Sequence, residues 1–189
     1  MIEVEIRGEL TKERYLELKM LCAKEGKHEG VLDRQMVLLK DVPGYSQNPN
    51  ERLNDVRIRV TNGVCEIMIK KKMAENNVGR SEWSVSLPGQ TLESAQQFVK
   101  ALGCSNGQWM HRVKDEYVFD GAQWSLVEAV PGIYYFEIEK TAESASDVAS
   151  VRDELMHIAH KQQLPVFSPE ESKKFIEHLG ETVNRHISW

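Results

Sequence analysis

The chain has 189 residues, of which 24 are lysine or arginine and 29 are aspartate or glutamate, so its formal net charge is −5 at pH 7. A chain of this length buries roughly 70% of the surface that it exposes when unfolded, so one domain can form without disulfides or a structural metal. The acidic balance excludes a protein that holds DNA or RNA through general positive charge.

The cysteines and the N-terminus indicate the compartment. Cys22, Cys65 and Cys104 are odd in number and lack Cys-x-x-Cys spacing, which is typical of free thiols in a reducing environment. Residues 1–7 contain no apolar run that suits a signal peptide or a membrane span. We therefore expect a soluble, cytoplasmic protein with no membrane partner.

The first half of the chain reads mostly as strands. A helix over 12–25, capped by Thr11, interrupts them. The dipeptide Asn62-Gly63 accepts the positive φ angles of a two-residue turn, so it predicts a tight hairpin. The strands expected in this half are 2–8, 35–41, 55–61, 64–70 and 80–87.

The second half adds three strands and three helices. Asp120-Gly121 predicts another hairpin, and a helix over 92–102 precedes it. Ser144 with Asp147 indicates the start of one C-terminal helix, and Ser168-Pro169-Glu170-Glu171 is a capping box for the other. The strands expected here are 114–119, 122–127 and 133–141. About eight strands, mostly joined by hairpins, predict an α+β protein with helices around a large antiparallel sheet.

Charged side chains share one face of almost every predicted strand, because strand side chains alternate with period two. The Asn62-Gly63 turn sets the register of its hairpin and pairs Arg59 with Glu66. Only the second strand shows no charged face. The cations on these faces are Arg7, Arg57, Arg59, Lys70, Lys72, Arg80, Arg112 and Lys114. The carboxylates are Glu3, Glu5, Glu82, Glu137 and Glu139.

Two interpretations of these charges stay open. On any single strand, a charged face is most often the solvent side of an antiparallel sheet. A sheet of about eight strands tends to close, and closure with the apolar faces outward under helices would bring the charges into one interior. The cations would then hold a polyanion such as a triphosphate. The carboxylates would hold Mg²⁺ or Mn²⁺, hard ions that bridge carboxylate and phosphate oxygens.

Six short motifs resemble, in the same order, the signature of the CYTH domains, also called triphosphate tunnel metalloenzymes. The first is Glu3-Val-Glu-Ile-Arg7, which resembles the Glu-x-Glu-x-Lys motif of that family. The others are Arg57-Ile-Arg59, Lys70, Arg80-Ser-Glu82, Arg112-Val-Lys114 and Glu137-Ile-Glu139. The resemblance covers residues 1 to about 141.

The resemblance implies an α+β fold built on an eight-stranded antiparallel closed β-barrel, or tunnel, with a charged interior and flanking helices. One domain would span 1–189, with tunnel strands over about 1–141 and C-terminal helices over about 144–186. The helix over 169–180, which carries Lys173 and Lys174, would plug one end of the tunnel.

The resemblance also implies roles for the charged residues. The catalytic residues would be Glu3, Glu5, Glu137 and Arg59. The divalent metal, Mg²⁺ or Mn²⁺, would be held by Glu3, Glu5, Glu82, Glu137 and Glu139. The phosphates would be bound by Arg7, Arg57, Arg59, Lys70, Lys72, Arg80, Arg112 and Lys114.

The chain departs from the family pattern at three places. Arg7 replaces the lysine of the first motif, and Arg112-Val-Lys114 reverses the usual order of its two cations. Val127 stands where the seventh strand commonly carries an aspartate. A gapless alignment places Val127 opposite Glu137 and requires a three-residue loop over 131–133.

In the cyclases of the family that aspartate joins the metal ligands, so its replacement favours hydrolysis of a triphosphate. Inorganic tripolyphosphate, thiamine triphosphate and nucleoside triphosphates are the expected substrates. The alternatives are a class IV adenylyl cyclase that converts ATP to cyclic AMP and a non-catalytic module that binds polyphosphate or nucleotide. An RNA 5′-triphosphate end is the one nucleic acid that would suit the site. The sequence leaves open whether two copies form a homodimer.

Overall fold

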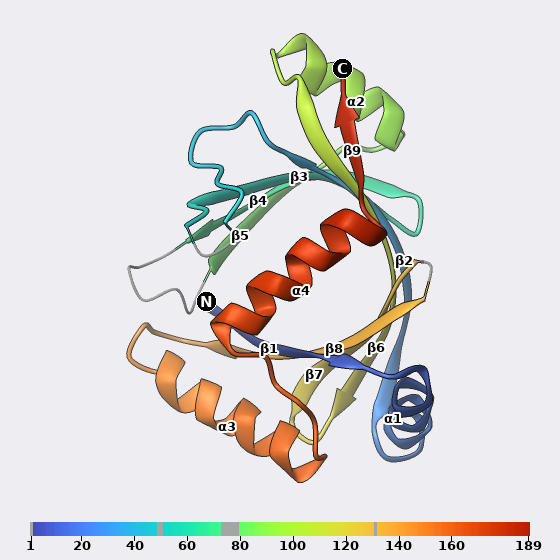
Figure 1. Cartoon of the computed structure of the whole chain (residues 1–189), viewed down its shortest axis with the longest axis vertical. Coiled ribbons are helices and arrows are strands. Elements are labelled where there is room, and N and C mark those ends of the chain that lie inside the picture. Colours follow the sequence, from blue (N-terminus) through green and yellow to red (C-terminus); the bar gives the residue numbers. More distant parts are fainter. Residues whose placement is uncertain (1, 49–50, 73–79, 131) are drawn as a thin grey trace.

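The computed structural model of the chain describes residues 2–48, 51–72, 80–130 and 132–189. They form an α+β fold in which one antiparallel sheet curls round on itself and helices cover its outside (Figure 1). In chain order, the elements are β1 (Ile2–Leu10), α1 (Lys12–Glu25), β2 (Lys27–Leu39), β3 (Asn54–Thr61), β4 (Val64–Lys72), β5 (Arg80–Ser86), α2 (Leu92–Ala101), β6 (Asn106–Phe119), β7 (Ala122–Ala129), β8 (Ile133–Ala142), α3 (Val148–Lys161), α4 (Pro169–Thr182) and β9 (Arg185–Ser188).

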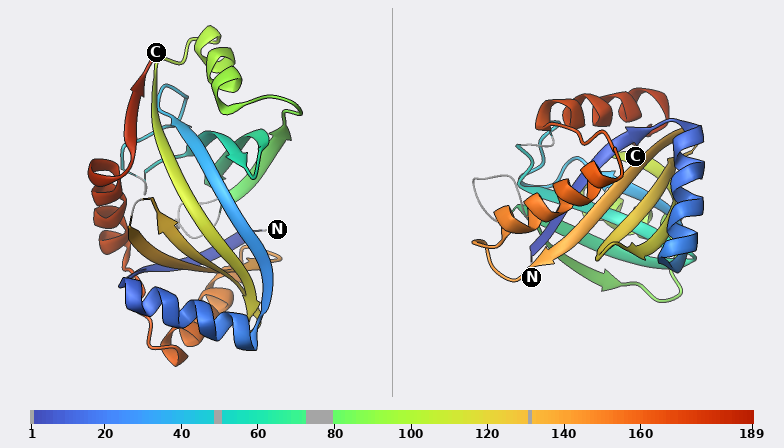
Figure 2. Two further views of the ribbon diagram at one scale, coloured as in Figure 1. Left: turned by 90° about the vertical axis from the view of Figure 1, so that its right-hand side faces the viewer. Right: turned by 90° about the horizontal axis from the view of Figure 1, so that it is seen from below.

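The first eight strands form a ring in the order β2-β3-β4-β5-β1-β8-β7-β6, and β6 pairs back with β2. Figure 2 shows β2 and β6 side by side along their length. One seam of the ring is short, because β1 and β5 are paired only where Glu3 lies opposite Arg80. The expected eight-stranded antiparallel sheet is confirmed, but the ring is not fully closed, since β1 and β5 separate beyond that pair.

Both predicted hairpin turns are present. Asn62 and Gly63 have φ angles of 48° and 84°, and Asp120 and Gly121 have φ angles of 50° and 75°, as a two-residue turn of this kind requires. The register expected from the first turn is confirmed, with Arg59 opposite Glu66.

Some elements differ from the sequence prediction. β2 begins at Lys27 and ends at Leu39, well before the start and shortly before the end that the sequence suggests. β9 was not expected, and it extends the sheet beyond β6. The helix predicted from Ser144 begins only at Val148, because the Asp147 carboxylate accepts hydrogen bonds from the Ser144 backbone N–H and hydroxyl and makes no helix cap.

The apolar faces of the strands lie outward, under the helices. On one side α1 and α3 cover a core that includes Val4 and Ile6 of β1 and Trp124 of β7. On another side α2 packs its Ala95 and Val99 against Ile58 and its neighbours. The charged faces of the strands are therefore left to line the inside of the ring. Within the described ranges, no helix is both long and apolar enough to span a membrane.

Candidate functional site

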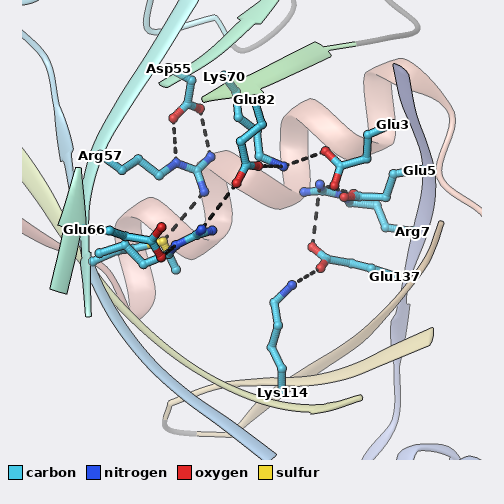
Figure 3. Close-up of polar contacts among 12 residues, drawn as sticks. Glu3, Glu5, Arg7, Asp55, Arg57, Glu66, Lys70, Glu82, Lys114 and Glu137 are labelled. Atoms are coloured by element: carbon cyan, nitrogen blue, oxygen red, sulfur yellow. Dashed lines mark hydrogen bonds and ion pairs between the residues drawn. The ribbon is translucent and has the colours of Figure 1, made fainter. Parts of the chain in front are cut away.

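The inside of the ring, which we call the tunnel, brings together most of the charged residues that the motifs predict. Between β1 and β8, Glu5 lies opposite Glu139 and Arg7 lies opposite Glu137. Because cross-strand partners share a face of the sheet, these four side chains lie on the same face. Lys70 lies opposite Glu82 between β4 and β5. Figure 3 shows Lys70 and Glu82 pointing toward Glu3, Glu5 and Arg7 from the opposite wall. The backbone of Arg80 is part of β5, but its side chain lies outside the described part of the structure.

One network of ion pairs connects β1, β6 and β8. The Arg7 guanidinium binds the Glu5 carboxylate and lies 3.6 Å from a Glu137 oxygen. The other oxygen of Glu137 accepts a hydrogen bond from the Lys114 ammonium group. Glu137 is thus held between two cations, and its side chain is only 9% exposed.

A second network connects β1, β3, β4 and β5. Lys70 bridges two carboxylates, with its Nζ 2.8 Å from Glu3 and 3.1 Å from Glu82. Arg59 likewise contacts Glu66 at 2.8 Å and Glu82 at 3.3 Å. Lys70 and Arg59 both contact Glu82, so replacing one of them alters the carboxylate that the other binds.

Arg57 is bound separately, near the wall formed by β3. Its Nε and Nη2 atoms donate to the two oxygens of Asp55, at 2.6 Å and 2.8 Å. Asp55 also accepts from buried Arg52 at 3.1 Å. Asp55 therefore fixes the direction in which the Arg57 guanidinium points.

Two carboxylates of β8 have opposite electrostatic environments. Burial alone would raise the pKa of Glu137, but Lys114 and Arg7 outweigh burial and lower this pKa to about 2. Burial raises the pKa of Glu139 to about 8, helped by the negative charges of Glu3, Glu5 and Glu137. Burial and these three negative charges therefore both favour the protonated form of Glu139.

The two ends of the tunnel differ in charge and in access. One end opens into a cavity of about 690 Å³ lined in part by Glu3, Glu82, Gln123 and Glu139. At the other end α4 lies across the ring (Figure 1). Three of the tunnel carboxylates therefore line the open end, together with Lys140.

The expected plug helix is present, but it acts through apolar side chains. Phe175 and Leu179 of α4 pack with Val127, Ala129 and Tyr135 of β7 and β8. The lysines that the sequence suggested for this role pair with carboxylates of the same helix, Lys173 with Glu177 and Lys174 with Glu170. Hydrophobic packing on Val127 therefore holds the helix over the tunnel.

The same packing explains Val127, and the register corrects its expected partner. Val127 lies opposite Tyr135, and Ser125 is the residue opposite Glu137. The residues between the paired Ala129 and Ile133 are 130–132, so the loop is one position earlier than expected, and Pro131 lies outside the described residues. The shift amounts to two residues along the strand, so Glu137 keeps the inward face that the sequence predicts. The tunnel face of β7 carries Gln123, Ser125, Val127 and Ala129 and no carboxylate.

The donor set suits a hard divalent cation. The carboxylates of Glu3, Glu5, Glu137 and Glu139 lie close enough to raise the pKa of one member, and such crowding is relieved when a cation binds. As the side chains stand, no three acidic, histidine or cysteine groups in the described ranges form a ready metal site. The carboxylates instead bind Arg7, Lys70 and Lys114, so they would have to change partners to hold a metal.

The tunnel also contains charged residues that the sequence analysis did not predict. Arg34 of β2 lies opposite Thr61 and Arg112, so it points to the same face as the motif cations. Burial lowers the pKa of Arg34, and neighbouring Arg59 lowers it further. Glu116 of β6 is a further inward carboxylate, and it accepts from Ser125 at 2.8 Å. Extending the alternation of β2 back from Met36 to Arg34 would have identified this arginine.

Comparison with known proteins agrees with this architecture. The family model described as the CYTH domain matches residues 1–172. No curated protein matches the chain. A Pyrococcus horikoshii protein of known structure is 16% identical, with a TM-score of 0.71 over 93% of this chain and 99% of that one.

Two further solved structures are similar at the level of the fold. A candidate adenylate cyclase from Vibrio parahaemolyticus is 14% identical, with a TM-score of 0.63 over 87% of this chain and 90% of its own. A protein from Hippeastrum, described as a candidate adenylyl cyclase with a dominant triphosphatase activity, is 16% identical, with a TM-score of 0.58 over 87% and 89%. Since the CYTH model covers nearly the whole chain, from the first strand into α4, this protein belongs to the CYTH domain family.

Proposed function

We propose that this protein hydrolyses a triphosphate in its tunnel with the help of Mg²⁺ or Mn²⁺. The observation that supports this most is the alternation of buried cations and carboxylates around one space, with Lys70, Arg59 and Lys114 each bound to a carboxylate. Side chains of both signs suit a ligand that is itself a polyanion carried with divalent metal. The similar protein from Hippeastrum is described as a triphosphatase, which agrees with this reading.

Ligand binding would proceed by exchange of partners. An entering phosphate group competes with Glu137 for Lys114 and Arg7, and with Glu82 for Lys70 and Arg59. The released carboxylates would be left buried and unpaired, which costs several kcal/mol unless a cation replaces the lost partner. Metal and triphosphate are therefore expected to bind together, each providing the partner that the other takes away.

Within the tunnel, the chain's own residues would orient the substrate. The guanidinium groups of Arg57 and Arg59 offer paired donors to phosphate oxygens, and Asp55 holds Arg57 in place. Glu3, Glu5, Glu137 and Glu139 would hold the metal, with Glu82 beside them. The bound metal would polarise phosphate oxygens and activate an attacking water.

Hydrolysis is favoured over cyclisation by the tunnel face of β7. This face carries no carboxylate, and Val127 is covered by α4. The aspartate that joins the metal ligands of family cyclases therefore has no counterpart on this strand. Class IV adenylyl cyclase remains the second candidate function because the protein from Vibrio parahaemolyticus is named for that activity.

The test is release of orthophosphate from inorganic tripolyphosphate, thiamine triphosphate and ATP with Mg²⁺ or Mn²⁺, with cyclic AMP assayed in the same ATP reaction. We expect metal-dependent orthophosphate without cyclic AMP, and we expect Glu137→Gln to abolish it. Glu154→Gln is the matched control, since Glu154 pairs with Lys140 on the outside of the protein. Cyclic AMP with pyrophosphate would identify a cyclase. Binding of the triphosphate without any product would identify a non-catalytic module.

A further inference from the structure

The segment that follows α4 returns the chain to the sheet as β9. This strand pairs with β6 and places Arg185 opposite Trp109. The Arg185 guanidinium lies 4.6 Å from the centre of the Trp109 ring, and after β9 the Trp189 backbone N–H donates to the Ser105 carbonyl at 3.0 Å. β9 is thus fixed to β6 at both of its ends. It lies outside residues 1–172, the range that the CYTH family model matches.

Asn184 lies between α4 and β9 and contacts a cation of the tunnel. Its backbone N–H donates to the Leu179 carbonyl, in the last turn of α4, at 2.8 Å. Its side-chain oxygen accepts a hydrogen bond from Arg112 Nη2, also at 2.8 Å. A guanidinium has only donors, so the oxygen of the amide, and not its nitrogen, must face Arg112. Asn184 is therefore held by α4 on one side and by β9 on the other.

Arg112 is held in a different way from Arg59 and Lys114, which bind carboxylates. Its Nη1 donates to the His111 carbonyl at 2.8 Å, so Asn184 provides the second of two neutral oxygens that fix the guanidinium. A guanidinium that is already oriented loses less entropy when it binds an anion. A neutral acceptor provides this orientation without placing a negative charge that would compete with a phosphate.

We propose that Asn184 is a positioning residue that fixes the direction of the Arg112 guanidinium, so that the C-terminal segment of this chain is part of its functional site. The inference rests on the proposed function, in which Arg112 binds phosphate, and adds a residue that acts through Arg112. Since the Asn184 backbone is bonded to α4, the same residue links the plug helix to a tunnel cation. Displacing β9 would therefore disturb ligand binding, although β9 is not one of the eight strands of the ring.

The test is calorimetric titration of inorganic tripolyphosphate with Mg²⁺ into wild type, Asn184→Leu and Asn184→Asp. Leucine has a similar volume but no acceptor, so Asn184→Leu should bind about 10-fold more weakly, as expected for loss of one hydrogen bond to a charged group. Aspartate keeps the acceptor but adds a negative charge beside Arg112, so Asn184→Asp should bind about 100-fold more weakly. Ser188→Ala is the matched control, because the Ser188 hydroxyl contacts His186 on the exposed part of β9. It should bind as wild type does.

Melting temperatures without ligand separate positioning from a purely structural role. Asn184→Asp should melt at or above the wild-type temperature, because Arg112 then binds a carboxylate, while its affinity for tripolyphosphate falls. A purely structural role of Asn184 predicts instead that affinity and melting temperature change in the same direction. That result for Asn184→Asp would contradict the proposal, and it can be measured even if Asn184→Leu does not fold.

A double-variant cycle tests whether Asn184 acts through Arg112. In an Arg112→Gln background, Asn184→Leu should cause no further loss of affinity, because the group that it positions is absent. An equal loss in both backgrounds, or wild-type affinity of both Asn184 variants, would overturn the positioning role while leaving the proposed function in place. A wild-type protein that does not bind tripolyphosphate would overturn both.

Discussion

Replacing Glu139 by glutamine should stabilise the protein, and more so as the pH rises. The fold raises the pKa of this carboxyl from 4.5 to about 8, through burial and the charges of Glu3, Glu5 and Glu137. A raised pKa in the folded state means that the carboxyl contributes stability below pH 4.5, and that this contribution is lost as the pH rises toward 8. Glutamine resembles the protonated form at every pH, so Glu139→Gln should escape this loss.

The size of the effect follows from the pKa. Each pKa unit corresponds to 1.36 kcal/mol, so the rise sets an upper limit of about 5 kcal/mol. The side chains of Glu3 and Glu5 are 33% and 20% exposed, so solvent weakens their repulsion on Glu139. We therefore expect the variant to gain about 1–3 kcal/mol in free energy of unfolding at pH 9 and much less at pH 5.

The assay is chemical denaturation at both pH values in the presence of a chelator. Glu9→Gln is the matched control, because Glu9 lies on the same face of β1 but at its exposed end. That variant should behave as wild type at both pH values. An equal effect of Glu139→Gln at pH 5 and pH 9 would show that the crowding of carboxylates is not what governs Glu139.

Three further predictions concern the tunnel and its plug. Glu137→Gln should lower the free energy of unfolding by about 3 kcal/mol at pH 7, because Lys114 loses the carboxylate that it binds, and the difference should shrink as the pH falls from 5 toward 2; denaturant titrations over that range measure it. Phe175→Ala should lower the free energy of unfolding by about 3 kcal/mol and expose the closed end of the tunnel, which calorimetry and limited proteolysis after α3 would detect; a native proteolysis pattern would contradict this. Val127→Asp should destabilise the protein and yield no cyclic AMP, because it places a carboxylate under an apolar helix; gain of cyclase activity would refute the interpretation.

For the charged residues whose side chains the structure describes, the face of the strand could be predicted from alternation alone. Glu3, Glu137 and Lys70 point inward because period-two alternation and the hairpin turns decide parity, and neither depends on distant contacts. The position of a partner along a strand depends on loop length, which explains why Val127 lies opposite Tyr135 and not Glu137.

What the sequence could not provide concerns the ends of elements and contacts across the fold. Arg34 was missed because β2 begins far earlier than its most apolar part suggests. The amphipathic pattern of α4 predicts a helix with an apolar stripe but not the surface that it covers. That surface, which includes Val127, exists only once β7 and β8 have paired.

The order of strands in the ring also limits when the chain can fold during synthesis. The hairpins β3–β4 and β6–β7 join neighbours in sequence, but β1 pairs with β8, where Ile2 lies opposite Ala142. β2 likewise pairs with β6, where Lys27 lies opposite Val118. Contacts between residues so far apart in sequence form slowly. On the ribosome, the first strand made must therefore wait for nearly the last, with its pairing edge exposed until β8 emerges.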